Sequence, residues 1–127
     1  MVSFSLEYKD NRLIKGKEST YKTVDVQIKH IIESWKISLF SFEWLTPEGK
    51  IRSFDELPEG EQEKYQAVMD DIQNNHTLER PILGIGIMDN IEIGSRRDVL
   101  LTVASQEQKS ISVHIPVRHE EEFMPYL

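Results

Sequence analysis

The sequence predicts an α+β domain with one antiparallel or mixed sheet of about five to six strands and two helices packed on it. Apolar residues that alternate with polar ones, as in residues 40–44 and 111–115, predict strands. Apolar residues that recur every three or four positions, as in residues 65–72, predict a helix. With 127 residues, the chain has the usual size of one domain, which we expect to span residues 1–127.

The first 20 residues predict a strand followed by a loop. Phe4, Leu6 and Tyr8 alternate with polar residues, so they share one face of an opening strand. Residues 9–20 are mostly polar, which is typical of a loop or a loose hairpin.

The next segment fits two structures. Residues 24–28 alternate between apolar and polar side chains, as in a strand. A second set of apolar residues instead has the spacing of a helix: Ile28, Ile31, Ile32 and Trp35. We favour a helix over residues 23–35, because the helical pattern extends over the longer window, and keep the strand as the alternative.

Residues 37–45 contain the strongest strand pattern. Phe40, Phe42 and Trp44 alternate with polar residues, and aromatic residues favour strands. A turn with Pro and Gly follows, so residues 51–54 are expected to return as a short partner strand. The aromatic face is expected to lie in the core, with contact to a partner as the alternative.

Residues 60–73 predict the second helix. Pro58 suits a helix entrance, because the missing N–H of proline has no partner there in any case. An apolar stripe follows at helical spacing, formed by Tyr65, Val68, Met69 and Ile72.

The C-terminal part predicts mainly strands. Residues 82–88 are an apolar run of strand length, and residues 91–93 continue it or begin another strand. Residues 99–104 and 111–115 predict a second hairpin. The tail, residues 117–127, is expected to be a short helix or loosely ordered.

The net charge of −7 is concentrated in the middle of the chain. Residues 43–71 hold 3 basic and 9 acidic groups, a net charge of −6. An acidic chain repels nucleic-acid backbones, so we expect no nucleic-acid partner. A more basic protein is the expected partner, steered by four carboxylates of this stretch: Glu56, Glu59, Glu61 and Glu63.

The sequence contains no arrangement of reactive side chains that demands chemistry. It has no cysteine, which excludes disulfides and thiolate zinc sites. We expect no metal and no cofactor. The N-terminus lacks a signal-peptide pattern and no apolar run reaches the length of a membrane span, so we expect a cytoplasmic protein with no membrane partner.

These observations favour a non-catalytic interaction or regulatory domain, of the inhibitor or immunity type. The first alternative is a small enzyme or anion-binding domain that uses Arg96, Arg97 and His114, because two arginines in one loop can clamp a carboxylate or phosphate. The second alternative is a structural homo-oligomer. Its copies would join through a sheet edge or the aromatic strand.

Overall fold

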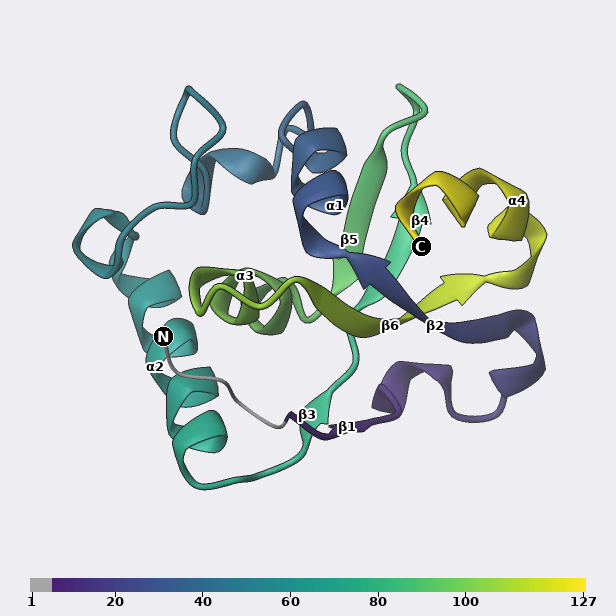
Figure 1. Ribbon diagram of the computed structural model, residues 1–127, viewed down its shortest axis with the longest axis horizontal. Coiled ribbons are helices and arrows are strands. Elements are labelled where there is room, and N and C mark those ends of the chain that lie inside the picture. Colours follow the sequence, from purple (N-terminus) through teal and green to yellow (C-terminus); the bar gives the residue numbers. More distant parts are fainter. Residues whose placement is uncertain (1–5) are drawn as a thin grey trace.

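The larger of two sheets is four-stranded and mixed (Figure 1). The computed structural model describes residues 6–127, and in the larger sheet the strand order is β2-β6-β4-β5. Pairing is antiparallel between β2 and β6 and between β4 and β5, whereas β4 runs parallel to β6. The bounds are β2 Tyr21–Gln27, β4 Ile82–Ile85, β5 Ile91–Ser95 and β6 Ser110–Pro116.

The smaller sheet joins two distant parts of the chain. β1 (Tyr8–Lys9) pairs in parallel with β3 (Leu78–Glu79). Of the predicted opening strand, Tyr8 is in β1, and Phe4 lies outside the described residues. The predicted loop over residues 9–20 contains two short 3-10 turns, Arg12–Ile14 and Glu18–Thr20.

The α+β class is therefore confirmed, but its predicted layout is wrong in detail. Residues 6–127 form a four-stranded and a two-stranded sheet with four α-helices, in place of a single sheet of five to six strands with two helices. The difference arises mainly in residues 37–45, 51–54 and 99–104, which were expected to be strands.

The ambiguous segment contains both of its candidate structures. β2 ends at Gln27, and α1 (Ile28–Trp35) begins at the next residue. The strand pattern was correct before this junction and the helical pattern after it. Ile28, Ile31 and Trp35 are the buried residues of α1, which places the helical stripe in the core.

The predicted aromatic strand over residues 37–45 is wrong. The chain continues in helical turns after α1, with a 3-10 turn at Ser41–Glu43. The Ser41 hydroxyl donates to the carbonyls of Lys36 and Ser38 at 3.0 and 2.9 Å, so local bonds satisfy the backbone in place of a strand ladder. Only the bridge Leu45↔Ile51 remains of the predicted hairpin, and the expected return strand is replaced by a 3-10 turn at Phe54–Glu56.

The second predicted helix is confirmed as α2 (Glu59–Gln73). Pro58 occupies the N-cap, and the buried residues are Val68 and Ile72. The turn before α2 is closed by a capping box in which the Ser53 and Glu56 side chains bond each other's backbone N–H groups.

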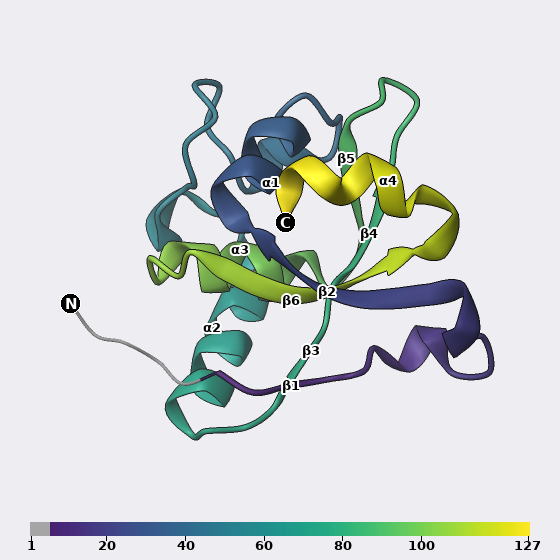
Figure 2. The ribbon, with the colours of Figure 1, turned by 45° about the vertical axis from the view of Figure 1, so that its right-hand side comes forward.

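The predicted strand over residues 99–104 is also wrong, because these residues belong to α3 (Arg97–Ser105). Figures 1 and 2 place α3 between α2 and the four-stranded sheet. A helix covered on several sides needs no polar stripe, and five consecutive residues, 99–103, are buried. Four of these five residues are apolar, so the stretch resembles a buried strand.

The C-terminal tail is helical and packs on the core. It consists of a 3-10 turn at Val117–His119, α4 (Glu120–Phe123) and a 3-10 turn at Met124–Tyr126. Phe123 is fully buried and lies edge-on to Tyr126. Of the two expectations for the tail, the short helix is confirmed.

Candidate functional site

The three residues predicted to bind an anion do not line one pocket. Arg96 and Arg97 line a pocket of about 410 Å³ at the start of α3, and His114 does not line it. Lys64, which also lines it, is paired with Glu61 at 3.2 Å. The anion-binding alternative thus remains a prediction without an assembled site.

Arg96 is held by carboxylates of its own chain. Its guanidinium donates to Glu79 at 2.8 Å and to Asp98 at 3.1 and 3.2 Å. Burial opposes the charge on Arg96, but the two carboxylates outweigh it and raise the Arg96 pKa. Burial likewise opposes the charge on Glu79, and hydrogen bonds from Arg12 and Arg96 outweigh it and lower the Glu79 pKa. These contacts also hold Arg96 in the left-handed conformation, with φ of 56°, that begins α3.

His114 is a buried part of the framework. Its Nε2 accepts the Asn11 backbone N–H at 3.0 Å, and its Nδ1 lies 3.1 Å from the Thr23 hydroxyl. Acceptance at Nε2 requires a neutral ring that carries its proton on Nδ1, and this N–H then donates to the Thr23 hydroxyl. Burial lowers the pKa of His114, in agreement with the neutral ring. With 1% exposure, His114 offers no surface to a ligand.

Arg97 stacks between two aromatic rings. Its guanidinium carbon lies 5.6 Å from the centre of the Trp35 ring and 5.5 Å from the centre of the Phe40 ring. Both distances are within the range of cation–π attraction. Arg97 therefore contacts both buried Trp35 and exposed Phe40.

The predicted acidic residues divide into two groups. Glu61 is mostly buried, because its carboxylate accepts the Trp44 indole N–H at 2.8 Å and pairs with Lys64. Glu56, Glu59 and Glu63 are exposed, and Glu56 also caps the turn before α2. Three of the four carboxylates are thus available to solvent, whereas Glu61 supports the core.

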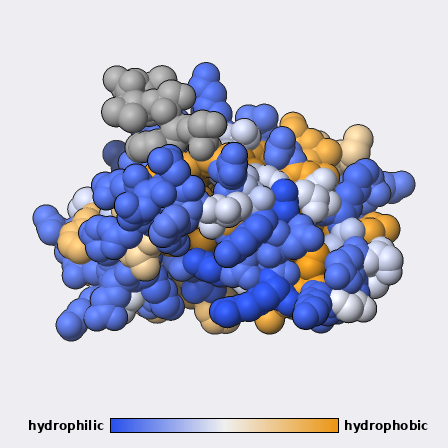
Figure 3. Space-filling model, turned by 90° about the horizontal axis from the view of Figure 1, so that it is seen from below, coloured by the Kyte–Doolittle hydropathy of each residue, from blue (hydrophilic) through white to orange (hydrophobic). Residues whose placement is uncertain are grey.

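The most exposed apolar residues of the middle segment follow α1 directly. Leu39 is 86% exposed, Phe42 66%, Phe40 57% and Ile37 55%, and we call these four residues the apolar cluster. Trp44 is buried, so the predicted aromatic face is divided between core and surface. In Figures 1 and 2 the segment lies at the same end of the molecule as the β4–β5 turn, which exposes Ile87 and Met88. The opposite end, seen in Figure 3, is covered mainly by hydrophilic residues.

Hydrogen bonds fix the backbone beneath the apolar cluster. The Ser38 hydroxyl donates to Glu92 of β5 at 2.6 Å, and the Ser38 N–H donates to the Trp35 carbonyl. On the other side, Arg52 donates to the Phe42 carbonyl at 2.9 Å. The cluster is therefore presented from a backbone that is bonded at both ends.

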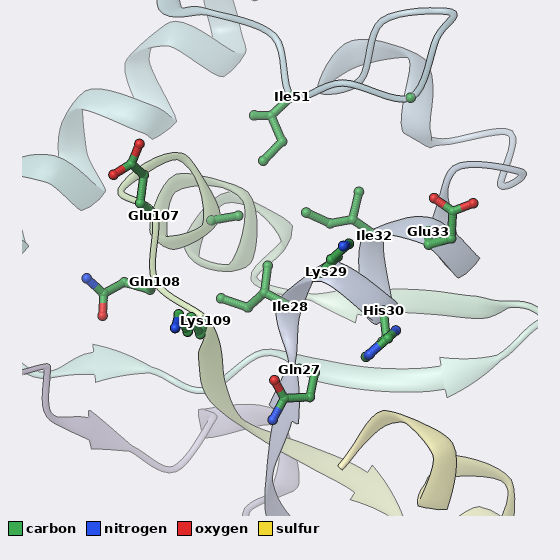
Figure 4. A pocket seen from close by; sticks show the side chains of 12 residues that line it. Gln27, Ile28, Lys29, His30, Ile32, Glu33, Ile51, Glu107, Gln108 and Lys109 are labelled. Atoms are coloured by element: carbon green, nitrogen blue, oxygen red, sulfur yellow. The ribbon is translucent and has the colours of Figure 1, made fainter.

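A pocket of about 550 Å³ lies on another part of α1 (Figure 4). It is bounded by the first turns of α1, the turn between α3 and β6, and the loop at residues 49–51. Its lining combines aliphatic, polar and charged side chains with His30, and contains no Phe, Tyr or Trp.

No protein-family model, curated protein or solved structure matches this chain. Within residues 6–127, no three His, Asp or Glu side chains are close enough to share a metal ion. In the same part of the chain, no helix combines the length and the apolar composition needed to cross a bilayer.

Sequence reasoning missed the exposure of the apolar cluster. Alternation placed Phe40, Phe42 and Trp44 together, although the backbone there turns helically. The available signal was the three-residue spacing of Ser38 and Ser41, which suits side-chain bonds within successive turns.

Proposed function

We propose that this protein is a non-catalytic interaction domain that binds a basic partner protein through the apolar cluster and the acidic surface beside it. The observation that carries the proposal is the exposure of four large apolar side chains within six residues. Exposed apolar groups gathered in this way mark interaction surfaces, and aromatic anchors supply much of the energy of such contacts.

The contacts beneath the cluster support this proposal. The Arg97 guanidinium contacts the Phe40 ring, and the Ser38 side chain bonds Glu92 of β5. A preorganised surface loses less conformational entropy on binding, so more of its contact energy appears as affinity. The same features would be unnecessary in a loop that only connects two elements.

Charge supports a basic partner. Residues 43–63, which follow the cluster, contain 2 basic and 7 acidic groups, a net charge of −5. One of the two basic residues, Arg52, is bonded to the Phe42 carbonyl. A surface with apolar anchors and an acidic border is complementary to a partner with apolar side chains flanked by Lys or Arg, and opposite charge accelerates association. This combination suits an inhibitor, an immunity-type protein or a regulatory subunit.

A test of the apolar contact compares Leu39→Asp with Leu13→Asp. Leu13 is a matched control because it is 56% exposed and lies in the 3-10 turn Arg12–Ile14, away from the cluster. Proteins captured from native lysate are identified and rebound in purified form. We expect a basic protein that binds the wild type and the control but not Leu39→Asp. Equal loss in both leucine variants, or retention by Leu39→Asp, would contradict the proposed contact.

A test of the charge uses Glu56→Gln, Glu59→Gln and Glu63→Gln together, leaving Glu61 unchanged because it bonds Trp44. We expect association with the purified partner to slow by about three- to tenfold at low salt and to depend less on ionic strength. Unchanged association kinetics would refute the steering role. Light scattering of the protein alone tests the homo-oligomer alternative, in which a second copy covers the cluster.

A further inference from the structure

The pocket on α1 has an aliphatic floor. Figure 4 shows the side chains of Ile28, Ile32 and Ile51 directed toward the same space from α1 and from the loop. Ile28 is 4% exposed, whereas Ile32, Ile51 and Ala104 are half-buried and pack against the core. Since Ala104 is small, room remains above the floor. The volume of about 550 Å³ is within the usual range for small-molecule sites.

Two lysines without acidic partners border this floor. Lys29 and Lys109 both line the pocket, and within residues 6–127 neither ammonium has a carboxylate within 4.0 Å. The Ile28 N–H donates to the Lys109 carbonyl at 2.9 Å, and Figure 4 shows the two lysine side chains on either side of Ile28. The pocket therefore has a cationic side next to its aliphatic floor.

The acidic residues of the rim do not neutralise these lysines. Glu33 is paired with Lys36 at 2.5 Å. Glu107 is exposed, and Figure 4 shows its carboxylate directed away from Lys29 and Lys109. An anionic group that enters beside Ile28 would thus meet two cations and no nearby competing carboxylate.

We propose that this pocket binds a small molecule that combines an aliphatic chain with one carboxylate. The carboxylate lies between Lys29 and Lys109, and the chain covers Ile28, Ile32 and Ile51. A floor of branched aliphatic side chains suits a flexible chain, because it offers no aromatic face on which a ring could stack. The site is independent of the apolar cluster, so its ligand does not depend on the proposed partner.

The test is a methyl-detected NMR titration of the full chain with octanoate. Octylamine has the same chain length and the opposite charge, which makes it the matched control ligand. We expect octanoate to shift the methyl signals of Ile28, Ile32, Ile51 and Ala104, and octylamine to bind at least about fivefold more weakly. No shift at these methyl groups, or equal binding of the two compounds, would overturn the proposal.

Variants test the assignment of the lysines. Lys29→Gln with Lys109→Gln should weaken octanoate binding by about five- to tenfold, whereas the exposed pair Lys15→Gln with Lys17→Gln should leave it unchanged. Equal effects of the two double variants would refute the proposed cationic side. Leu39→Asp should bind octanoate normally, which separates this result from failure of the proposed function.

One further arm identifies the source of the carboxylate. Acetyl-leucyl-leucine presents the same chemistry as the end of a peptide chain. If acetyl-leucyl-leucine binds more weakly than octanoate, the result supports a small-molecule ligand. Tighter binding of acetyl-leucyl-leucine would refute that assignment and favour the C-terminus of a peptide as the ligand.

Discussion

Replacement of Asn11 by alanine should remove the side-chain hydrogen bonds that fasten the N-terminal segment to β5 and to the chain between β3 and β4. The Asn11 side chain donates to the Arg80 carbonyl at 2.9 Å and to the Ser95 hydroxyl at 3.0 Å, and it accepts the Leu13 N–H at 2.9 Å. Asn11 is 1% exposed, so water cannot replace these bonds without a local rearrangement.

The expected magnitude follows from these three bonds. At about 1 kcal/mol for each lost hydrogen bond, Asn11→Ala should lower the free energy of unfolding by about 3 kcal/mol. For a chain of this size, that loss corresponds to a decrease in Tm of roughly 10 °C. Asn11→Asp should be at least as destabilising at pH 7, because a carboxylate oxygen would then face the Arg80 carbonyl.

Urea unfolding followed by circular dichroism measures this loss. Asn74→Ala is the control, because exposed Asn74 makes one side-chain bond, to the Asp70 carbonyl. We expect that control to change the free energy of unfolding by less than about 0.5 kcal/mol. A similarly small effect of Asn11→Ala would refute the inference that residues 8–14 are fastened to the sheet through Asn11.

Three further predictions concern stability. The His114 pKa lies below its ordinary value of 6.5 because the ring is buried. The contribution of His114 to the free energy of unfolding should therefore be complete above pH 6.5 and decline as the pH falls below it, since the unfolded chain then binds the proton more readily. Urea unfolding at pH 7.5 and 5.5 should show less acid sensitivity in His114→Gln than in the wild type, and identical pH profiles would contradict this. Phe123→Ala should destabilise the protein by about 3–5 kcal/mol in thermal unfolding, because Phe123 is fully buried, and a loss below about 1 kcal/mol would show that the tail is not packed. Gly86→Ala should lower the free energy of unfolding in urea by about 1–3 kcal/mol, because the added Cβ would lie 2.9 Å from the Glu92 side chain. Gly60→Ala is the control and should be neutral or stabilising, because its added Cβ has no atom within 4 Å. A larger loss of stability in Gly60→Ala than in Gly86→Ala would contradict the packing at the β4–β5 turn.

The elements that were predictable have patterns set by one buried face. The stripe of α2 faces the core through Val68 and Ile72, and β6 buries Ile111, Val113 and Ile115. In such elements the spacing of the apolar residues identifies the face that is buried in the core. The junction of β2 and α1 was ambiguous because both periodicities overlap within a few residues.

The remaining elements depend on surroundings that a local pattern does not record. α3 is buried over residues 99–103, where Val99, Leu100 and Leu101 are consecutive, so the apolar run conceals the helical period. In residues 37–45 the alternation is real, but serine side-chain bonds hold the backbone in turns. Trp44 then points inward while Phe40 and Phe42 remain at the surface.

The candidate site residues illustrate the same limit over longer distances. The partner of Arg96, Glu79, is 17 residues away in sequence, and the Asn11–His114 bond spans 103 residues. The sequence shows that Arg96 and Arg97 are adjacent. It does not show that other parts of the chain supply their partners, which are Glu79 for Arg96 and the rings of Trp35 and Phe40 for Arg97. The acidic stretch was easier to anticipate, because charged side chains tend to remain exposed wherever the chain places them.

The pairing of β1 with β3, and of Asn11 with His114, has a consequence for folding during synthesis. Residues 8–11 leave the ribosome well before the positions that they bind, because β3 follows only after α2 and His114 lies 103 residues beyond Asn11. The segment around Asn11 must therefore wait for His114 until residue 114 has been made, and such long-range closure is slow. A pause in translation before residue 114 would prolong the period in which a chaperone or a protease can reach that segment.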